Sequence, residues 1–251
     1  MLLDLALWLA TPAPWRHRRL GYVRESVLLS GRARRCRRAW APHAARSREA
    51  VLAACADLPL RRAAVVLGSG PLADVPLSQL AAGFERVLLV DAVHPLGARL
   101  AARRFPNVRL VTADLAGADD PVGALCGGAD LTVSANLLTQ LPVVPMDRHE
   151  ARGLAEPERL GARIVADHLA ALGRLPGRVC LVTDTAQREE DRAGRVTGRL
   201  DLLFGVRLPP SPLAWDWELA PFGEAARHRR LIHSVRAYPD WGAAGGGSSL
   251  S

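Results

Sequence analysis

The chain has 251 residues, of which 49% are hydrophobic, and a formal net charge of +8. This length suits one sizeable α/β domain with an appendage. The chain contains no lysine, which excludes catalysis through a lysine Schiff base, a P-loop lysine or a Tyr-x-x-x-Lys dehydrogenase site. Isoleucine and asparagine are nearly absent as well, so a GC-rich genome explains the excess of arginine. Charge of that origin is spread over a surface and does not favour a nucleic-acid partner.

Residues 1–62 are predicted to form an N-terminal helical extension. A third of the arginines lie between Arg16 and Arg48, interleaved with apolar residues such as Leu20, Val27 and Trp40. That mixture favours a helical lid packed on the main domain over a solvated arm that binds phosphates or an acidic partner. The apolar start of the chain is too short to span a membrane, and it lacks the basic flank of a signal peptide.

The cysteines predict a reduced, cytoplasmic protein with free thiols. Cys36, Cys55, Cys126 and Cys180 are far apart, and none belongs to a C-x-x-C pair or lies near a histidine at metal-ligand spacing. Disulfides are rare in reducing compartments. We therefore expect no metal site and a cytoplasmic location.

The clearest pattern lies between residues 63 and 91. The apolar run 63–67 predicts a strand that is buried on both faces. It is followed by Gly68-Ser69-Gly70, an amphipathic helix over 76–84, and a second apolar run, 87–90, that ends in Asp91. Glycines allow a ligand to approach the backbone closely, and a carboxylate at the tip of the second strand can accept hydrogen bonds from ribose hydroxyls. The pattern predicts a site for a nucleoside-containing cofactor.

The rest of the chain continues the alternation of strands and helices. Further strands are predicted at 108–112, 129–133 and 178–183, with helices after Asp91 and over 158–175. Residues 213–219 and 230–237 alternate in hydrophobicity, with a turn between them, as in an antiparallel hairpin. We expect a doubly wound α/β sheet, mostly parallel and closed by a terminal antiparallel hairpin, over residues 63–240. A flexible tail is expected over 241–251, and the Glu189-Glu190-Asp191 run is expected to be a solvated loop.

Over residues 63–238 this pattern resembles the class I S-adenosylmethionine-dependent methyltransferases, as a divergent member. The segments that carry the resemblance are Val65–Pro71, Leu88–Asp91, Val111–Asp114, the fourth strand with its exit to Pro142, and His168–Asp184. The resemblance implies a Rossmann-like fold, S-adenosylmethionine as cofactor and methyl transfer to an unidentified small-molecule or macromolecular acceptor. The cofactor-binding residues it implies are Gly68, Ser69, Gly70, Asp91, Ala92, Asp114 and Asn136.

Two positions depart from the family pattern. Val66 stands where the family usually has an acid, and Leu72 stands where it usually has a third glycine. Asp74 is a candidate to supply the missing carboxylate. The departures leave open a non-catalytic, methyltransferase-like protein that binds a nucleoside or a partner through its arginine-rich N-terminal segment. A dinucleotide site at Gly68-x-Gly70-x-x-Ala73 is a further alternative, which Pro71 and Pro76 disfavour because that motif's helix begins inside the glycine loop.

No residue is predicted to be a general base. Asn136 and Gln140 follow the fourth strand at the carboxyl edge of the sheet and are the candidates to orient an acceptor; the alternative is that their amides satisfy backbone groups of the loop. His94 could line the cleft or could begin a helix. His168 is predicted to be a packed helix residue, and Trp215 and Trp217 are predicted to share one buried face of their strand.

Overall fold

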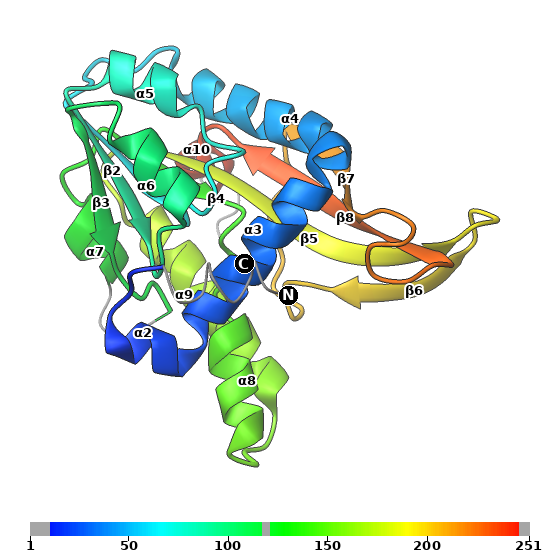
Figure 1. Ribbon diagram of the computed structural model, residues 1–251. Helices are drawn as coiled ribbons and strands as arrows, with labels where there is room; N and C mark the ends of the chain where they lie inside the picture. The colour runs from blue at the N-terminus through cyan, green and yellow to red at the C-terminus, as the bar shows by residue number, and fades with distance from the viewer. Residues whose placement is uncertain (1–10, 117–120, 246–251) are drawn as a thin grey trace, which may run out of the picture.

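The computed structural model describes residues 11–116 and 121–245, which form one sheet of eight strands with helices on both faces (Figure 1). The N-terminal helices are α2 (Trp15–Leu20), α3 (Tyr22–Arg35) and α4 (Arg37–Cys55). The alternating part comprises β1 (Ala63–Leu67), α5 (Leu77–Gly83), β2 (Arg86–Asp91), α6 (Leu96–Ala102), β3 (Val108–Thr112), α7 (Pro121–Cys126), β4 (Leu131–Ala135), α8 (Val143–Ala151) and α9 (Pro157–Gly173). The C-terminal part comprises β5 (Arg178–Asp191), β6 (Val196–Asp201), β7 (Leu213–Ala220), β8 (Arg229–Tyr238) and α10 (Trp241–Gly245).

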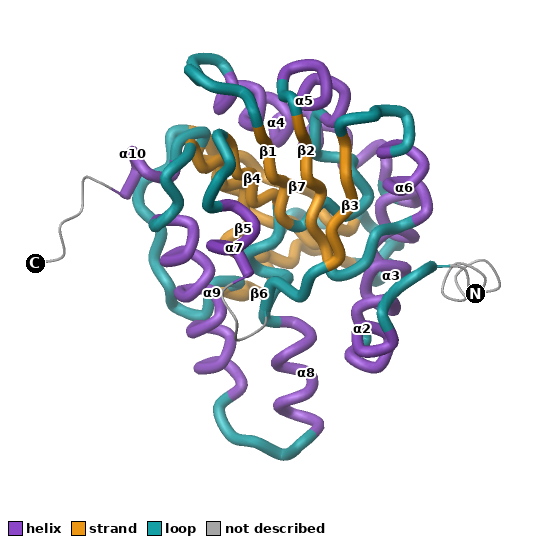
Figure 2. The backbone as a smooth tube through the Cα atoms, turned by 90° about the vertical axis from the view of Figure 1, so that its left-hand side faces the viewer, coloured by secondary structure: helices purple, strands orange, loops and turns teal. Residues whose placement is uncertain are grey.

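The sheet has the order β3-β2-β1-β4-β5-β8-β7, and β6 pairs with β5 outside this path. The first five strands are parallel neighbours, whereas β8 pairs antiparallel with both β5 and β7. Parallel strands joined by helices place helices on the two faces, as the tube in Figure 2 shows. The predicted Rossmann-like sheet, mostly parallel with a terminal antiparallel hairpin and an N-terminal helical extension, is confirmed.

Strand β1 is buried along its whole length because both of its faces are covered. Ala64 and Val66 belong to the hydrophobic cluster that includes residues of α4, α5 and α6. Val65 and Leu67 point the other way, into the cluster formed with α7, α9 and α10. Alternate side chains of a strand lie on opposite faces of the sheet, so a continuous apolar run is what a central strand requires.

Helix α4 is part of the core and does not simply cover it. Trp40, Val51 and Ala54 are buried in the cluster on the α4 face of the sheet. The Trp40 ring packs edge-on against Trp217 with 4.9 Å between ring centroids, and its Nε1–H donates to the carbonyl oxygen of Leu219 at 2.9 Å. Within the predicted extension 1–62, α4 is therefore packed into the core against the sheet. Helices α2 and α3 are the parts of the extension that lie over the edge of the sheet.

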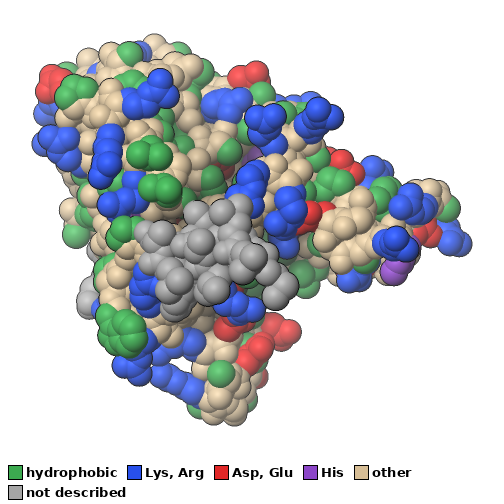
Figure 3. All heavy atoms as spheres, viewed as in Figure 1, with side chains coloured by type: hydrophobic (Ala, Val, Ile, Leu, Met, Phe, Trp, Pro, Cys, Tyr) green, Lys and Arg blue, Asp and Glu red, His purple; other side chains and the backbone are tan. Residues whose placement is uncertain are grey.

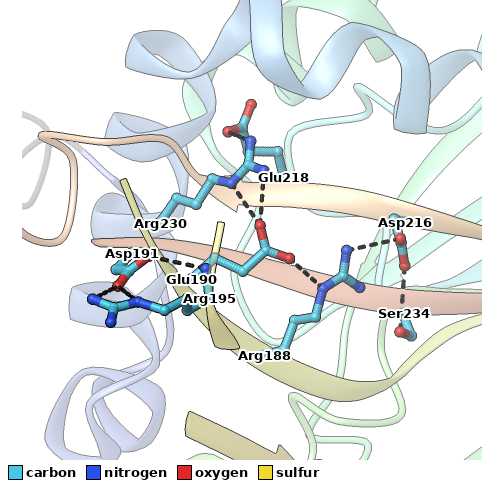
Figure 4. A network of polar contacts seen from close by, with 8 residues as sticks. All are labelled: Arg188, Glu190, Asp191, Arg195, Asp216, Glu218, Arg230 and Ser234. Atoms are coloured by element: carbon cyan, nitrogen blue, oxygen red, sulfur yellow. Dashed lines mark hydrogen bonds and ion pairs between the residues drawn. The ribbon is translucent and has the colours of Figure 1, made fainter. Parts of the chain in front are cut away.

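The expectation that Glu189–Asp191 form a solvated loop is wrong. These residues lie in β5, which runs to Asp191 and forms an arm with β6 and the start of β8 (Figure 1). Glu190 is buried and bridges Arg188 (2.7 Å) and Arg230 (2.7 Å), and Arg188 also reaches Asp216 at 2.9 Å (Figure 4). Cross-strand ion pairs of this kind let acidic residues occupy strand positions. The hydrophobicity pattern of the sequence alone therefore does not predict this part of the strand.

Two smaller features bear on the sequence-based expectations. Trp241–Gly245, placed in the predicted tail, form α10, and Trp241 is buried against Tyr238 with 5.1 Å between ring centroids. Residues 246–251 lie outside the described residues. The four cysteines are buried. Among the helices that the structure describes, none combines the length and the apolar character needed to cross a membrane.

Candidate functional site

A cavity of about 290 Å³ opens at the edge where the parallel strands end. The loops after β1, β2, β3 and β4 form its floor, and α3 covers it with Tyr22, Glu25, Leu29 and Arg32. The carboxyl ends of parallel strands are where doubly wound sheets bind their ligands. Of the residues that the sequence predicted, Gly68, Gly70, Asp91, Ala92, Asp114, Asn136 and Gln140 all line this cavity.

The loop after β1 has a backbone conformation that favours glycine. Gly68 has φ +73° and Gly70 has φ +45°, both in the left-handed region. Leu72 lies in the same region, with φ +63°. A side chain in this region costs about 1–2 kcal/mol. The loop therefore has a glycine-like backbone conformation at Leu72 although the residue is not glycine.

We expect Gly68→Ala to destabilise the fold more than Gly70→Ala. A Cβ at Gly68 would lie 2.7 Å from the Leu137 Cβ, whereas a Cβ at Gly70 would have its nearest contact at 3.8 Å. Both changes strain the backbone by about 1–2 kcal/mol, and the overlap at Gly68 adds about 1–3 kcal/mol. Urea unfolding of both variants measures the difference. Equal losses of stability would show that Leu137 moves aside freely.

Asp91 closes the glycine loop from the tip of β2. Its Oδ2 accepts the N–H of Gly70 at 2.7 Å, and its Oδ1 accepts the N–H of Val93 at 3.3 Å. Burial raises the pKa of this carboxyl, and the Gly70 N–H opposes that rise. Because the Val93 bond is long, Oδ1 retains capacity to accept a further donor from a ligand.

Asp114, just beyond the end of β3 and beside β2, is held by the N-terminal extension. Its Oδ1 accepts the Tyr22 hydroxyl from α3 at 2.7 Å and the N–H of Ala116 at 3.1 Å. Burial raises the pKa of Tyr22, and the hydrogen bond to Asp114 raises it further. The phenol therefore stays protonated and acts as a donor, which ties α3 to the floor of the cavity.

Asn136 lies at the junction of three elements. It has φ +50°, and its side-chain amide donates to Asp74 Oδ2 at 2.5 Å and lies 3.2 Å from His43 Nε2. Burial raises the pKa of Asp74. Asp74, the candidate replacement for the missing acid, is therefore held by Asn136 and is not among the residues that line the cavity.

The remaining predicted residues differ in how deeply their side chains are buried. Ser69 is fully buried below the loop, whereas Gln140 is exposed at the cavity rim. Val66 lies in the hydrophobic cluster under α4. His94 is buried with its Nε2 3.0 Å from the carbonyl oxygen of Val111. His168 is a packed helix residue, as predicted, with its Nε2 3.0 Å from Ser134 Oγ.

The sequence analysis assigned no role in a site to the residues at the other end of the cavity. Asp184, Trp217, Leu219 and His233 line it from β5, β7 and β8. Trp215 and Trp217 share a buried face, as predicted, and Trp217 stacks on His43 with 4.0 Å between ring centroids. One signal for Asp184 was available, because it directly follows the predicted strand 178–183 and so had to lie at the carboxyl edge.

The cavity is acidic although the protein is basic. The residues that line it include four acids and one arginine, namely Glu25, Asp91, Asp114, Asp184 and Arg32. Arginines are instead spread over the face in Figure 3, along the N-terminal helices and the arm. The charge of the cavity lining is thus negative, although the whole chain has a net charge of +8. An acid-lined cavity in a low-dielectric setting attracts neutral or cationic ligands and repels anionic ones.

Neither a model of a known protein family nor a curated protein matches the chain. Solved structures do resemble it. A 1,6-didemethyltoxoflavin N1-methyltransferase from Burkholderia thailandensis, with S-adenosylhomocysteine bound, is 18% identical, with a TM-score of 0.44 over 90% of each chain. The N-methyltransferase NodS from Bradyrhizobium japonicum is 14% identical, with a TM-score of 0.43 over 94% of this chain and 96% of that one.

A third similar structure is the magnesium protoporphyrin IX methyltransferase from Synechocystis, which is 14% identical with a TM-score of 0.40 over 77% of this chain and 79% of that one. Similarity at these levels says nothing about activity. The strand order of the chain itself shows the fold, with a parallel core β3-β2-β1-β4-β5 and an antiparallel C-terminal part. The chain has a Rossmann-like fold, and the solved structures that it resembles at low sequence identity include methyltransferases.

Proposed function

We propose that this protein is an S-adenosylmethionine-dependent methyltransferase. The observation that carries the proposal is the acid-lined cavity at the carboxyl edge of the sheet, where Gly68, Gly70, Asp91 and Asp114 come together. Asp91 is placed to receive ribose hydroxyls, and Asp114 to receive an adenine amino group. Ser69, Ala92 and Asn136 complete the proposed cofactor-binding set, and Gln140 at the rim is a candidate contact for the acceptor.

The charge of the cavity fits this cofactor better than a dinucleotide. S-adenosylmethionine carries a sulfonium cation, which the acids of the lining stabilise. A pyrophosphate would need donors or positive charge beside the glycine loop. Here the Gly70 N–H is already donated to Asp91, and the next helix, α5, begins only at Leu77. These contacts favour the methyltransferase over the dinucleotide alternative.

The bound cofactor would supply an electrophilic methyl group. The chain's own task is then to hold the acceptor in line with that group and to exclude water. Helix α3 suits this task, because Tyr22 fixes it to Asp114 and Leu29 covers the cavity. The extension is thus better suited to a lid than to the interaction arm of a non-catalytic protein.

Asp91→Ala should weaken the binding of S-adenosylhomocysteine by about 1.5–3 kcal/mol, since hydrogen bonds to a charged group have that size. Asp91→Asn keeps the shape and can still accept from Gly70, so it separates the role of the charge from that of the loop. Isothermal titration calorimetry gives the affinities, with Asp147→Ala on the exposed side of α8 as the control. Unchanged affinity in a folded Asp91→Ala variant would remove Asp91 from the proposed site.

A further inference from the structure

Both α2 and α3 are attached to one end of the cavity, where Asp91, Ala92 and Asp114 lie and which we call the nucleoside end. His17 Nδ1, from α2, lies 2.7 Å from the carbonyl oxygen of Ala92. The Tyr22 hydroxyl, from α3, donates to Asp114 Oδ1 at 2.7 Å. The two helices are thus fastened to residues of the proposed cofactor-binding set.

The contact with Tyr22 determines how the Asp114 carboxylate can meet a ligand. Its Oδ1 accepts two hydrogen bonds, from the Tyr22 hydroxyl at 2.7 Å and from the N–H of Ala116 at 3.1 Å. Within residues 11–116 and 121–245, its Oδ2 accepts no hydrogen bond, although Asp114 lines the cavity. Two donors on one oxygen hold the carboxylate in one orientation. The other oxygen then remains as the acceptor for an N–H or O–H of a ligand.

Helix α3 packs on the protein mainly through a small hydrophobic cluster at its Tyr22 end. Val23 and Val27 are buried there against Val93, from the loop after β2. This cluster is separate from the larger one that contains α4, which Leu29 of α3 meets while only partly buried. The contacts that hold the Tyr22 end of α3 in place are therefore few, and they lie at the nucleoside end.

The other end of α3 joins the core helix α4 at Cys36. Cys36 has φ −91° and ψ 12°, which are not helical values, and the two helices point in different directions (Figure 1). Hinges use residues at the ends of elements in this way. Arg35, beside the junction, binds Glu224 through hydrogen bonds of 2.6 Å to 3.2 Å. Points beside a pivot move little, so this ion pair persists when the Tyr22 end of α3 swings away.

We propose that Tyr22 is a positioning residue that couples recognition of the nucleoside to closure of α2 and α3 over the cavity. This inference rests on the proposed function for the identity of the nucleoside, the adenosine part of the cofactor. A donor at Asp114 Oδ2 favours the same orientation of the carboxylate that accepts the Tyr22 hydroxyl, so each hydrogen bond stabilises the other. The attachments of α2 and α3 lie on the loops after β2 and β3, so adenosine alone is sufficient for closure.

Hydrogen–deuterium exchange of α3 tests this coupling, with adenosine, S-adenosylhomocysteine and methionine as the probes. A helix of 14 residues is marginally stable on its own in water, so the amides of α3 exchange when it leaves the surface. At ten times its Kd, a ligand that binds only the closed form should slow this exchange about tenfold. We expect that effect from adenosine and from S-adenosylhomocysteine, no effect from methionine, and no change in α4.

Two variants separate closure from recognition. Tyr22→Phe should speed the exchange of α3 in the free protein by about tenfold or more, because a hydrogen bond to a charged group has that strength, and should weaken the binding of adenosine. Asp114→Asn keeps an oxygen for Tyr22 and turns the open oxygen into a donor, so adenosine should no longer slow α3. Tyr238→Phe is the matched control, because it removes a hydroxyl that donates to the Pro209 carbonyl in the core at 2.6 Å, and it should leave α3 unchanged.

The proposal is overturned if α3 exchanges as slowly in Tyr22→Phe as in the wild type, or if adenosine still slows α3 in Asp114→Asn. It is also overturned if adenosine slows α4 as much as α3, or if S-adenosylhomocysteine or methionine slows α3 and adenosine does not. Calorimetry on the same protein preparations tests the proposed function separately. Binding of S-adenosylhomocysteine without a change in α3 refutes the coupling alone. Closure by adenosine without binding of S-adenosylhomocysteine refutes the proposed function and leaves the role of Tyr22 in place.

Discussion

Trp40→Ala is expected to lower the free energy of unfolding by about 3–5 kcal/mol, the usual cost of removing a large aromatic side chain from a core. The Trp40 side chain packs on Trp217 and donates to the Leu219 carbonyl, so its loss leaves both a cavity and an unpaired acceptor. Chemical denaturation measures the change. Trp15→Ala is the matched control, because Trp15 is 73% exposed and its removal should change stability little.

A loss of less than about 1 kcal/mol at Trp40, within the range of ordinary surface substitutions, would contradict the assignment of α4 to the core. The same assignment governs how the extension can be removed. A truncation that ends before α4 should leave a folded protein with an uncovered cavity. A truncation through residue 62 also removes Val51 and Ala54 from the core and should not fold.

The protein should lose stability on acidification between about pH 6.5 and pH 4 through two buried histidines. Burial lowers the pKa of His43 and of His168 to about 4. Both are neutral in the folded state, whereas in the unfolded chain they take up a proton at about pH 6.5. Their contribution is thus complete above pH 6.5 and is lost as the pH falls toward 4. The loss is about 3 kcal/mol for each histidine.

Unfolding curves at neutral pH and near pH 4.5 measure this dependence. His168→Asn should remove about one histidine's share of it, although the variant starts from a lower stability at neutral pH. His228→Asn changes an exposed histidine and should leave the dependence as it is in the wild type. A His168→Asn variant with the full wild-type pH dependence would show that His168 is protonated in the folded protein.

The fold could be read from the sequence wherever burial leaves a periodic pattern. The run 63–67 is continuously apolar and the stretch 213–219 alternates in hydrophobicity, and both are strands. The extension of β5 through Glu189–Asp191 has no such pattern, because arginines on neighbouring strands neutralise its acids. Ion pairs between strands depend on the register of the sheet, which a single sequence does not contain.

The residues of the candidate site also differ in whether the sequence could predict them. Gly68, Gly70, Asp91 and Asp114 follow strands that could be recognised, so their meeting at one edge could be predicted. His233 lies in the middle of β8 and reaches the cavity only because β8 inserts between β5 and β7 and because β5 is bulged at Asp184. Both features depend on contacts between residues that are far apart in the sequence, so no local sequence pattern predicts them.

The acid-lined cavity is the proposed binding site of the methylation cofactor. Titration of the wild-type protein with S-adenosylhomocysteine in a calorimeter tests it most directly. We predict saturable binding at one site, weakened by Asp91→Ala and unaffected by Asp147→Ala. Absence of any heat from S-adenosylhomocysteine and from S-adenosylmethionine, at protein concentrations well above the micromolar range, would contradict it.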